Sequence, residues 1–133
     1  MIAGPTAVGK TKIAIEVAKR LNGEIISADS MQIYKKMDIG TAKPTVEEMD
    51  GIPHHLLSIV DIGEKFSVVD FQKMAFDCIE DIISRGKVPI VCGGTGLYIN
   101  GLIEEIDYGE VTSSDELREE LEKVAAEKGN EYL

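Results

Sequence analysis

The sequence predicts an α/β fold, an open and mostly parallel sheet with helices on both faces. Three observations lead to this prediction. A glycine-rich segment at residues 4–11 follows a short apolar run and precedes an amphipathic stretch. Runs typical of buried strands then alternate with helical periodicities over the first hundred residues. Polar or glycine-rich segments also follow the strands directly, at the edge where such folds bind ligands.

The first segment, Gly4 to Thr11, matches the phosphate-loop pattern G-x-x-x-x-G-K-[ST] at every fixed position. Gly4 and Gly9 are expected to let the backbone close around an anion, and Lys10 supplies a positive charge for phosphate oxygens. The Thr11 hydroxyl is a predicted ligand of the Mg²⁺ that accompanies a di- or triphosphate. We therefore predict a P-loop NTPase-like core with Mg²⁺ as cofactor, in which the phosphates are held by Gly4, Pro5, Thr6, Ala7, Val8, Gly9, Lys10 and Thr11.

The phosphate loop leads into the first predicted helix, residues 9–21. Asn22-Gly23 is a typical helix end, and residues 24–28 predict a short buried strand. Residues 29–53 show little periodicity, and a segment of that length inside a compact domain is commonly functional. The apolar stripe of the helix is predicted to consist of Ile13, Ala14, Val17, Ala18 and Leu21.

The second half of the chain continues the alternation. Residues 55–60 favour a strand, and Ser67 with Asp70 predicts a helix start, with Phe66 and Phe71 as a hydrophobic staple. The stripe from Phe71 to Ile83 carries that helix to Arg85-Gly86. A buried strand is then predicted at 87–92, and a helix at 97–103 after Gly93-Gly94-Thr95-Gly96. At the level of domains, we predict an incomplete P-loop catalytic core over 1–107 and the start of a helical subdomain over 108–133.

Size and composition suit a globular domain. The chain has 133 residues, of which 44% are hydrophobic, and no apolar run approaches the ~18 residues of a membrane span. We expect no secretory leader, because the phosphate loop follows Met1-Ile2-Ala3 directly, and the short first strand suggests that the chain is part of a longer protein. The lack of a long apolar run also leads us to expect no membrane association. Cys78 and Cys92 lack metal-binding spacing, so we expect buried free thiols in the reducing cytoplasm.

The formal net charge of −10 is unevenly distributed. Residues 1–60 carry seven Lys and Arg against seven Asp and Glu, whereas residues 61–133 carry seven against seventeen. A strong electrostatic binder of nucleic acid normally presents a basic face. The segment alone is therefore not expected to bind nucleic acid strongly.

Three segments that follow strands should meet at one crevice: residues 4–11, 29–34 and 93–95. Asp29 could act there as a general base or hold Mg²⁺ through water, or it could simply form a turn. Thr95 could contact a ligand while serving as the N-cap of the next helix. Tyr34 and Tyr98 could stack on a base, although packing is the commoner role of such residues.

Adjacent histidines, His54 and His55, point to opposite faces of a strand and cannot grip one metal together. They are therefore not expected to be metal ligands.

Longer blocks of sequence resemble the tRNA dimethylallyltransferase family, also called tRNA isopentenyltransferases. The blocks are residues 4–11, Asp29-Ser30-Met31-Gln32-Ile33-Tyr34, residues 37–44, Gly51-Ile52-Pro53-His54-His55-Leu56, residues 66–71 and Gly93-Gly94-Thr95-Gly96-Leu97-Tyr98. They occur in family order up to about Ile103, with a weaker match from Asp115 onward.

This resemblance implies transfer of a dimethylallyl group from dimethylallyl pyrophosphate to N6 of the adenine just 3′ of the anticodon in tRNA. By similarity, Asp29 and Thr95 are catalytic, with Asp29 as the base, and Thr6 to Thr11 hold the pyrophosphate with Mg²⁺. By similarity also, the tRNA is contacted by Asp29, Ser30, Met31, Gln32, Thr95 and Arg118, and residues 108–133 begin a tRNA-contacting subdomain. A monomer is expected.

The family continues well beyond Leu133 with a basic helical region, so the 133-residue segment alone is expected to have little activity. Three alternatives stay open. An adenylate isopentenyltransferase would prenylate free adenine nucleotides with the same chemistry. An ATP-dependent small-molecule kinase would use the loop for ATP-binding but needs clamping arginines, and the chain has only Arg20, Arg85 and Arg118. A nucleotide-gated interaction module would not need Asp29.

Overall fold

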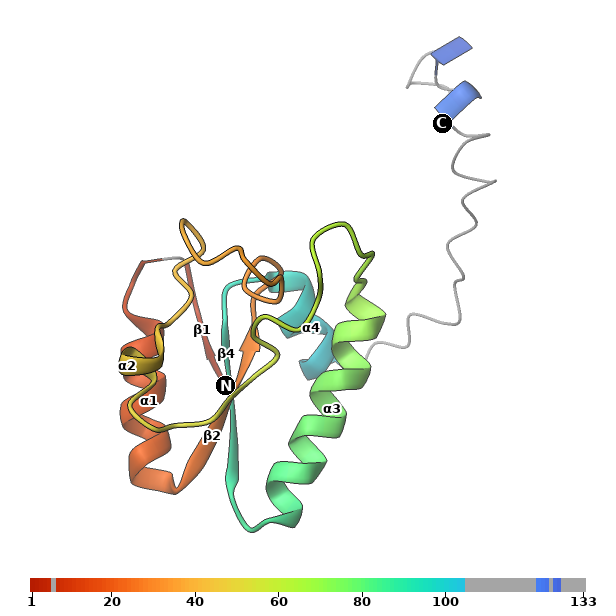
Figure 1. Cartoon of the computed structure of the whole chain (residues 1–133). Coiled ribbons are helices and arrows are strands. Elements are labelled where there is room, and N and C mark those ends of the chain that lie inside the picture. The colour runs from red at the N-terminus through yellow and green to blue at the C-terminus, as the bar shows by residue number, and fades with distance from the viewer. Residues whose placement is uncertain (6, 105–121, 125, 128–133) are drawn as a thin grey trace.

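The computed structural model describes residues 1–5, 7–104, 122–124 and 126–127. Figure 1 shows strands in the middle, helix α1 on one side, and helices α3 and α4 on the other. Residues 122–124 and 126–127 are helical, whereas the predicted boundary at residue 108 lies outside the described residues. The elements in chain order are β1 (Ile2–Ala3), α1 (Lys10–Leu21), β2 (Gly23–Ala28), α2 (Val46–Met49), β3 (His54–His55), α3 (Val68–Ser84), β4 (Val88–Gly93) and α4 (Gly96–Ile103).

The four strands form one parallel sheet in the order β1-β4-β2-β3. Strand β2 pairs with β4 along its whole length, from Gly23 opposite Val88 to Ala28 opposite Gly93. Every residue of β2 is buried, as expected of a central strand covered by helices on both faces. The predicted open, mostly parallel sheet is therefore confirmed.

The predicted strand over 55–60 is wrong in its extent. Strand β3 contains only His54 and His55, which pair with Ile25 and Ile26 of β2. Leu56 and Ser58 then adopt left-handed backbone, with φ of 60° and 53°. Such angles are incompatible with an extended strand, so the chain leaves the sheet immediately after His55.

Helix α1 covers one face of the sheet with small residues. Ala14 and Ala18 are fully buried and Ile15 is 6% exposed, and together they pack on Ile25 and Cys92. The buried face of α1 is rotated about the helix axis from the predicted apolar stripe, because Ile13 and Leu21 are both more than half exposed. The two alanines let the helix approach the sheet closely, which brings Ile15 onto the strands.

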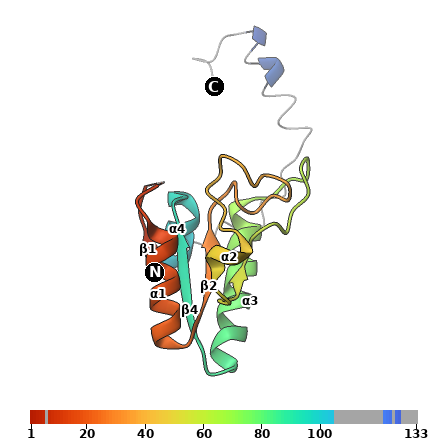
Figure 2. The same ribbon diagram turned by 60° about the vertical axis from the view of Figure 1, so that its left-hand side comes forward.

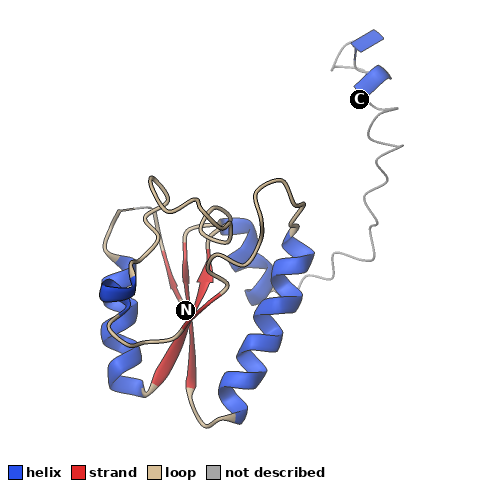
Figure 3. Ribbon diagram, in the orientation of Figure 1, coloured by secondary structure: helices blue, strands red, loops and turns tan. Residues whose placement is uncertain are grey.

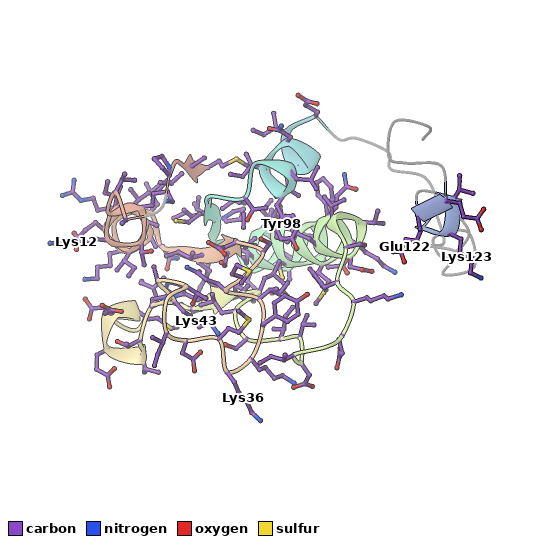
Figure 4. All side chains as sticks on the ribbon, turned by 90° about the horizontal axis from the view of Figure 1, so that it is seen from above. Lys12, Lys36, Lys43, Tyr98, Glu122 and Lys123 are labelled. Atoms are coloured by element: carbon purple, nitrogen blue, oxygen red, sulfur yellow. The ribbon has the colours of Figure 1, made fainter. Side chains whose placement is uncertain are left out.

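Helices α3 and α4 cover the other face. Phe71 is fully buried, and its ring stacks on that of Tyr98 with a centroid distance of 4.1 Å and an interplanar angle of 9°. Figure 4 shows Tyr98 in the interior, between these helices and the sheet. Tyr98 is thus a packing residue, and its ring face is not available to stack on a base.

The predicted helix ends are confirmed. Ser67 and Asp70 form a capping box, in which the Ser67 hydroxyl accepts from the Asp70 N–H and the Asp70 carboxylate accepts from the Ser67 N–H. Gly86, just beyond the end of α3, has a φ of 74°, and Asn22 ends α1 with a φ of 52°. Both residues leave their helices through the left-handed conformation that glycine and asparagine tolerate best.

The long segment predicted to lack periodicity contains only the four-residue helix α2. A buried ammonium organises the rest. The side chain of Lys43 is 7% exposed, and its Nζ donates at 2.8 Å to the Tyr34 carbonyl, the Asp38 carboxylate and the Ser58 hydroxyl. In Figure 4 Lys43 lies among these loops, whereas Lys36 points outward. Lys43 therefore fastens two irregular segments to each other.

All loops that follow the strands gather at the same edge of the sheet, because the strands are parallel (Figures 2 and 3). This edge carries the phosphate loop and the loops after β2 and β4. Among the described residues, none of the helices is both long and apolar enough to cross a membrane.

Candidate functional site

A crevice of about 320 Å³ lies at the carboxyl edge of the sheet. Each of the three segments predicted to meet there contributes to its lining. The phosphate loop and α1 supply Ala7, Gly9, Lys10, Thr11 and Ala14, strand β2 and its loop supply Ile25, Ser27, Asp29 and Gln32, strand β4 supplies Cys92 and Gly93, and further wall residues are Thr41, Ala42, Pro44, His54 and Leu57.

The phosphate loop ends in a glycine that turns the backbone into α1. Gly9 is the N-cap residue of this helix and has a left-handed φ of 84°. The first helical hydrogen bond is donated by the Ile13 N–H to the Gly9 carbonyl, so the N–H groups of Lys10, Thr11 and Lys12 have no acceptor in the helix. The first turn contains no acidic residue. This end of the helix is therefore suited to an anion.

The predicted phosphate-binding residues do not all face the crevice. Ala7, Gly9, Lys10 and Thr11 line it, whereas the Val8 side chain is 57% exposed. The Lys10 ammonium donates to the carbonyl of Pro5, within its own loop. Gly4 borders the loop after β4, and Thr6 lies outside the described residues.

Asp29 follows β2 directly and faces the crevice, as predicted. Its Oδ1 accepts hydrogen bonds from the N–H groups of Met31 at 2.9 Å and Gln32 at 3.2 Å. The turn-forming role and the crevice position thus occur together. Within the described part of the chain, no group donates a hydrogen bond to the other oxygen, Oδ2. That oxygen is available to a ligand.

Thr95 stands at the N-cap of α4, yet its hydroxyl does not cap the helix. Its Oγ1 accepts a hydrogen bond from the Ser30 N–H at 2.9 Å and donates to Ser30 Oγ at 3.3 Å. The Thr95 N–H donates to the Ala28 carbonyl. Thr95 is not among the residues that line the crevice, and it ties the end of β4 to the turn that carries Asp29.

Two glycines allow this close approach. A Cβ on Gly93 would lie 2.2 Å from the Ala28 carbonyl oxygen, and a Cβ on Gly94 would lie 3.1 Å from the Gly4 carbonyl oxygen. Only glycine fits at position 93 without moving the neighbouring strand. The three loops can therefore converge because these positions lack side chains.

Four of the six predicted tRNA contacts, Asp29 to Gln32, lie on one turn after β2. Ser30 is held by Thr95, and Met31 is 47% exposed beside it. The Gln32 amide is engaged inside the protein, since its Nε2 donates to the carbonyls of Thr41 at 2.9 Å and Ala42 at 3.2 Å. It thus braces the crevice wall. Arg118 lies outside the described residues.

Sequence reasoning missed the far wall of the crevice, including Thr41, Pro44 and His54. The Gly40–Pro44 block inside an aperiodic segment was the available signal for the first two residues. The two histidines point to opposite faces of the strand, as expected. His54 lines the crevice, whereas His55 Nε2 donates to the Glu24 carboxylate at 2.7 Å. Which of the pair would face the crevice could not be predicted.

The cysteines agree with the expectation of free thiols. Cys92 is buried and Cys78 is partly buried, and neither forms a disulfide. Burial raises the pKa of both thiols. Both are therefore protonated and unreactive near neutral pH.

The described arginines stay away from the crevice. Arg85 lies at the amino edge of the sheet, where its guanidinium binds Glu24 and Asp81, and Arg20 lies in the last turn of α1. Neither residue lines the cavity. The clamp that a small-molecule kinase requires is not found in the part of the chain that the structure describes.

Comparison with known proteins supports the resemblance noted from the sequence. The family model of IPP transferase matches residues 32–133. Over all 133 residues, the chain is 61% identical to the tRNA dimethylallyltransferase of Acetivibrio thermocellus and 62% identical to that of Alkaliphilus oremlandii. Both alignments cover 100% of this chain and 42% of the relative.

Solved structures agree. The tRNA isopentenylpyrophosphate transferase of Bacillus halodurans matches with a TM-score of 0.79 and 54% identity, over 96% of this chain and 42% of that chain. A eukaryotic dimethylallyltransferase acting on tRNA matches with a TM-score of 0.72 and 35% identity, over 98% and 36%. The chain spans less than half the length of these relatives. The family match, the sequence identity and the shared fold together show that this chain belongs to the IPP transferase family.

Proposed function

We propose that this protein transfers a dimethylallyl group from dimethylallyl pyrophosphate to N6 of the adenine 3′ of the anticodon in tRNA. The names of its relatives support this proposal. The observation that carries it is the crevice, in which Lys10 from the phosphate loop and Asp29 from the tip of β2 face one cavity. A leaving pyrophosphate and an incoming amine need these two groups on opposite sides of the reacting carbon.

The phosphate loop would hold the pyrophosphate. The N–H groups at the start of α1 that lack a helical acceptor would donate to it, and no carboxylate in the first turn opposes its binding. On pyrophosphate binding, the Lys10 ammonium exchanges the Pro5 carbonyl for phosphate oxygens. These donors take up negative charge as the allylic C–O bond breaks, so they stabilise the transition state more than the bound donor.

Mg²⁺ is the cofactor that this site would take. The described residues contain no cluster of three or more His, Cys, Asp or Glu that could hold a metal alone. This agrees with Mg²⁺, which commonly binds through one or two protein oxygens together with phosphates and water. Thr11 supplies such an oxygen to the crevice. When bound, Mg²⁺ would neutralise charge on the pyrophosphate.

Asp29 would act as the general base. The lone pair of the adenine N6 amine forms a bond to C1 of the dimethylallyl group, and the C1–O bond breaks, leaving its electron pair on pyrophosphate. One N6 proton passes to Asp29 Oδ2. The N–H groups of Met31 and Gln32 hold Oδ1, so the carboxylate is oriented without losing the oxygen that accepts the proton.

Thr95 would position this base, since it holds the backbone of the turn that begins at Asp29. The target adenine must leave its stack in the anticodon loop to reach the crevice. Ser30 and Met31 lie on that turn and would contact the extruded nucleotide, with Gln32 bracing the wall beside it and Arg118 contributing from outside the described residues. We also infer that the protein is a monomer. A cytoplasmic location is in keeping with its free cysteines.

A donor and acceptor assay tests the proposal. Full-length protein is incubated with Mg²⁺, labelled dimethylallyl pyrophosphate and either tRNA or AMP, and the same reactions are repeated with Asp29→Ala. We expect label in tRNA and a large loss of rate with Asp29→Ala while tRNA binding is retained. Label in AMP alone would indicate an adenylate isopentenyltransferase. Phosphate transfer from ATP would indicate a kinase, and an unchanged Asp29→Ala variant would rule out the proposed base.

A further inference from the structure

Residues 36–43, called the projecting loop below, hold one aliphatic side chain out in solvent. Ile39 is 98% exposed, more than any other large hydrophobic residue in the described part of the chain. A lone exposed aliphatic residue is common on protein surfaces and needs no explanation by itself. Ile39 differs from such residues because a strained and braced loop presents it beside the crevice.

Three residues of the projecting loop have left-handed backbone. Lys36 has a φ of 61°, Gly40 of 81° and Ala42 of 52°. Glycine adopts this conformation freely, whereas it is unfavourable for lysine and alanine. Such strain persists only where the surrounding structure enforces it, and it is typical of ligand-binding segments.

Hydrogen bonds on both sides of Ile39 enforce this shape. The Thr41 hydroxyl donates to the Met37 carbonyl at 2.6 Å, which closes a turn around Ile39. The carboxylate of Asp38 accepts from the buried Lys43 ammonium, so its negative charge is balanced. Ile39 is therefore preorganised, and a partner that contacts it does not have to order the loop.

The projecting loop runs directly into the crevice wall. Thr41 and Ala42 line the crevice, and the Gln32 amide donates to the carbonyls of both. Ile39 precedes Thr41 by two residues, so their Cα atoms are at most roughly 7 Å apart. A nucleic acid that inserts one base into the crevice therefore brings the neighbouring nucleotides within reach of Ile39.

A cation accompanies Ile39 on the loop. Lys36 is exposed and points outward in Figure 4. Lys35 is paired with Asp61 at 3.0 Å, whereas no carboxylate of the described residues pairs with Lys36. An aliphatic side chain and a free ammonium match the faces of unstacked bases and the phosphates of an RNA loop.

We propose that Ile39 and Lys36 hold the anticodon arm of the tRNA while the target adenine lies in the crevice. Extrusion of the adenine uncovers a face of the adjacent base, and Ile39 packs against that face. Lys36 binds a backbone phosphate nearby. Both are positioning residues, since neither touches the reacting atoms, and the inference rests on the proposed function.

Ile39→Ser tests the apolar contact in the full-length protein. A tRNA with 2-aminopurine in place of the target adenine reports extrusion, because this base gains fluorescence on leaving the stack and lacks the N6 amine. We expect Ile39→Ser to reduce the fluorescence gain and to lower kcat/KM for ordinary tRNA by about tenfold. Affinity for dimethylallyl pyrophosphate, measured calorimetrically with Mg²⁺ and without tRNA, should stay within about twofold.

Two further variants control this result. Ile39→Val keeps an aliphatic side chain and should restore most of the extrusion and of kcat/KM. Val46→Ser is the matched control, because Val46 is 79% exposed on α2, outside the projecting loop, and it should change neither quantity. Since Ile39 is almost fully exposed, Ile39→Ser should keep its fold, which urea unfolding checks.

Lys36→Gln tests the phosphate contact separately. The tRNA dissociation constant is measured from about 50 to about 200 mM salt. Loss of one phosphate contact should lower the slope of log affinity against log salt by about one. Lys73→Gln, which changes an exposed lysine on α3, is the matched control and should leave the slope unchanged. An unchanged slope for Lys36→Gln would contradict the phosphate contact.

The outcomes separate this inference from the proposed function. Equal losses of dimethylallyl pyrophosphate and tRNA affinity in Ile39→Ser would indicate a merely structural support of the wall and overturn the inference. It is also overturned if the unmodified protein prenylates tRNA and Ile39→Ser extrudes and uses it equally well, since the loop would then serve another partner. If the unmodified protein transfers no label to tRNA, the proposed function itself fails.

Discussion

Strand β2 has a carboxylate at each end, and the two differ in almost every respect. Glu24, at the amino end, is 2% exposed, and both of its oxygens are bound by the side chains of Arg85, Lys87 and His55. Asp29, just past the carboxyl end, binds only backbone N–H groups and faces a cavity. The contrast teaches that the partners of an acidic residue, more than its type or its strand, separate a structural role from a chemical one.

Glu24 joins three parts of the fold. Arg85 binds it with two hydrogen bonds, of 2.6 Å to Oε1 and 2.8 Å to Oε2. Lys87 Nζ donates to Oε1 and His55 Nε2 donates to Oε2, both at 2.7 Å. The Arg85 hydrogen bonds, helped by those of Lys87 and His55, hold the pKa of Glu24 well below its usual range although burial acts in the opposite direction. This carboxylate has no oxygen left for chemistry.

The sharpest way to break the comparison is to exchange the carboxylate of Asp29 for an amide. Asp29→Asn keeps an oxygen for the Met31 and Gln32 N–H groups but removes the base, so we expect the transfer rate to fall about a thousandfold. Stability should change by less than about 0.5 kcal/mol. Single-turnover kinetics with tRNA and urea unfolding measure the two effects. A variant that is inactive because it is unfolded would contradict the assignment.

The complementary change is Glu24→Gln at the other end of the strand. It leaves Lys87 without its carboxylate partner and Arg85 with Asp81 alone, and we expect a loss of about 3 kcal/mol in the free energy of unfolding. Folded protein should retain its transfer rate, since Glu24 is remote from the crevice. Urea denaturation measures the loss, and Asp81→Asn, which removes the exposed partner of Arg85, is the control. A loss below about 1 kcal/mol for Glu24→Gln would show that the cluster adds little.

Acid should reveal Glu24 in the unmodified protein. Its pKa is lower in the folded state than in the unfolded chain, so its stabilisation is complete above the unfolded value of about 4.3 and is lost as pH falls toward the folded value. Between pH 6 and pH 3 we expect the protein to lose about 2 kcal/mol more stability than Glu24→Gln does. Urea titrations at each pH measure the difference. Parallel pH curves would remove Glu24 from the explanation.

A smaller effect should follow from Thr95, which supports the Asp29 end of the strand. Thr95→Val keeps the shape and removes the hydroxyl that accepts from the Ser30 N–H, so we expect a roughly tenfold lower kcat with little change in KM for dimethylallyl pyrophosphate. Thr95→Ser should restore most of the rate. If Thr95→Val instead raised KM alone, the hydroxyl would be a substrate contact and the positioning role would be wrong.

The sequence pattern predicted what local chemistry and topology determine. The phosphate loop, the capping box of α3 and the parallel sheet follow from residue spacing, and parallel strands bring Asp29 and the phosphate loop to one edge. The position of Asp29 could thus be predicted without any knowledge of its neighbours. Its role as a base and the tRNA contacts stay predictions.

What could not be predicted depends on distant partners. Glu24 lies 61 residues from Arg85, and nothing in the local pattern pairs them. Strand β3 is shorter than the strand predicted over residues 55–60, because Leu56 and Ser58 adopt the left-handed backbone conformation, which neither residue type favours. The face of His54 depended in turn on the register of β3 against β2.

The three acceptors around Lys43 have a practical consequence for lysine chemistry. An amine held by a carbonyl, a carboxylate and a hydroxyl is shielded from acylating reagents, whereas Lys36 projects from the same loop into solvent. Mass-spectrometric footprinting should therefore label Lys36 quickly and Lys43 only when the loop detaches from the Ser58 segment. The pair forms a built-in reporter of whether the far wall of the crevice is in place.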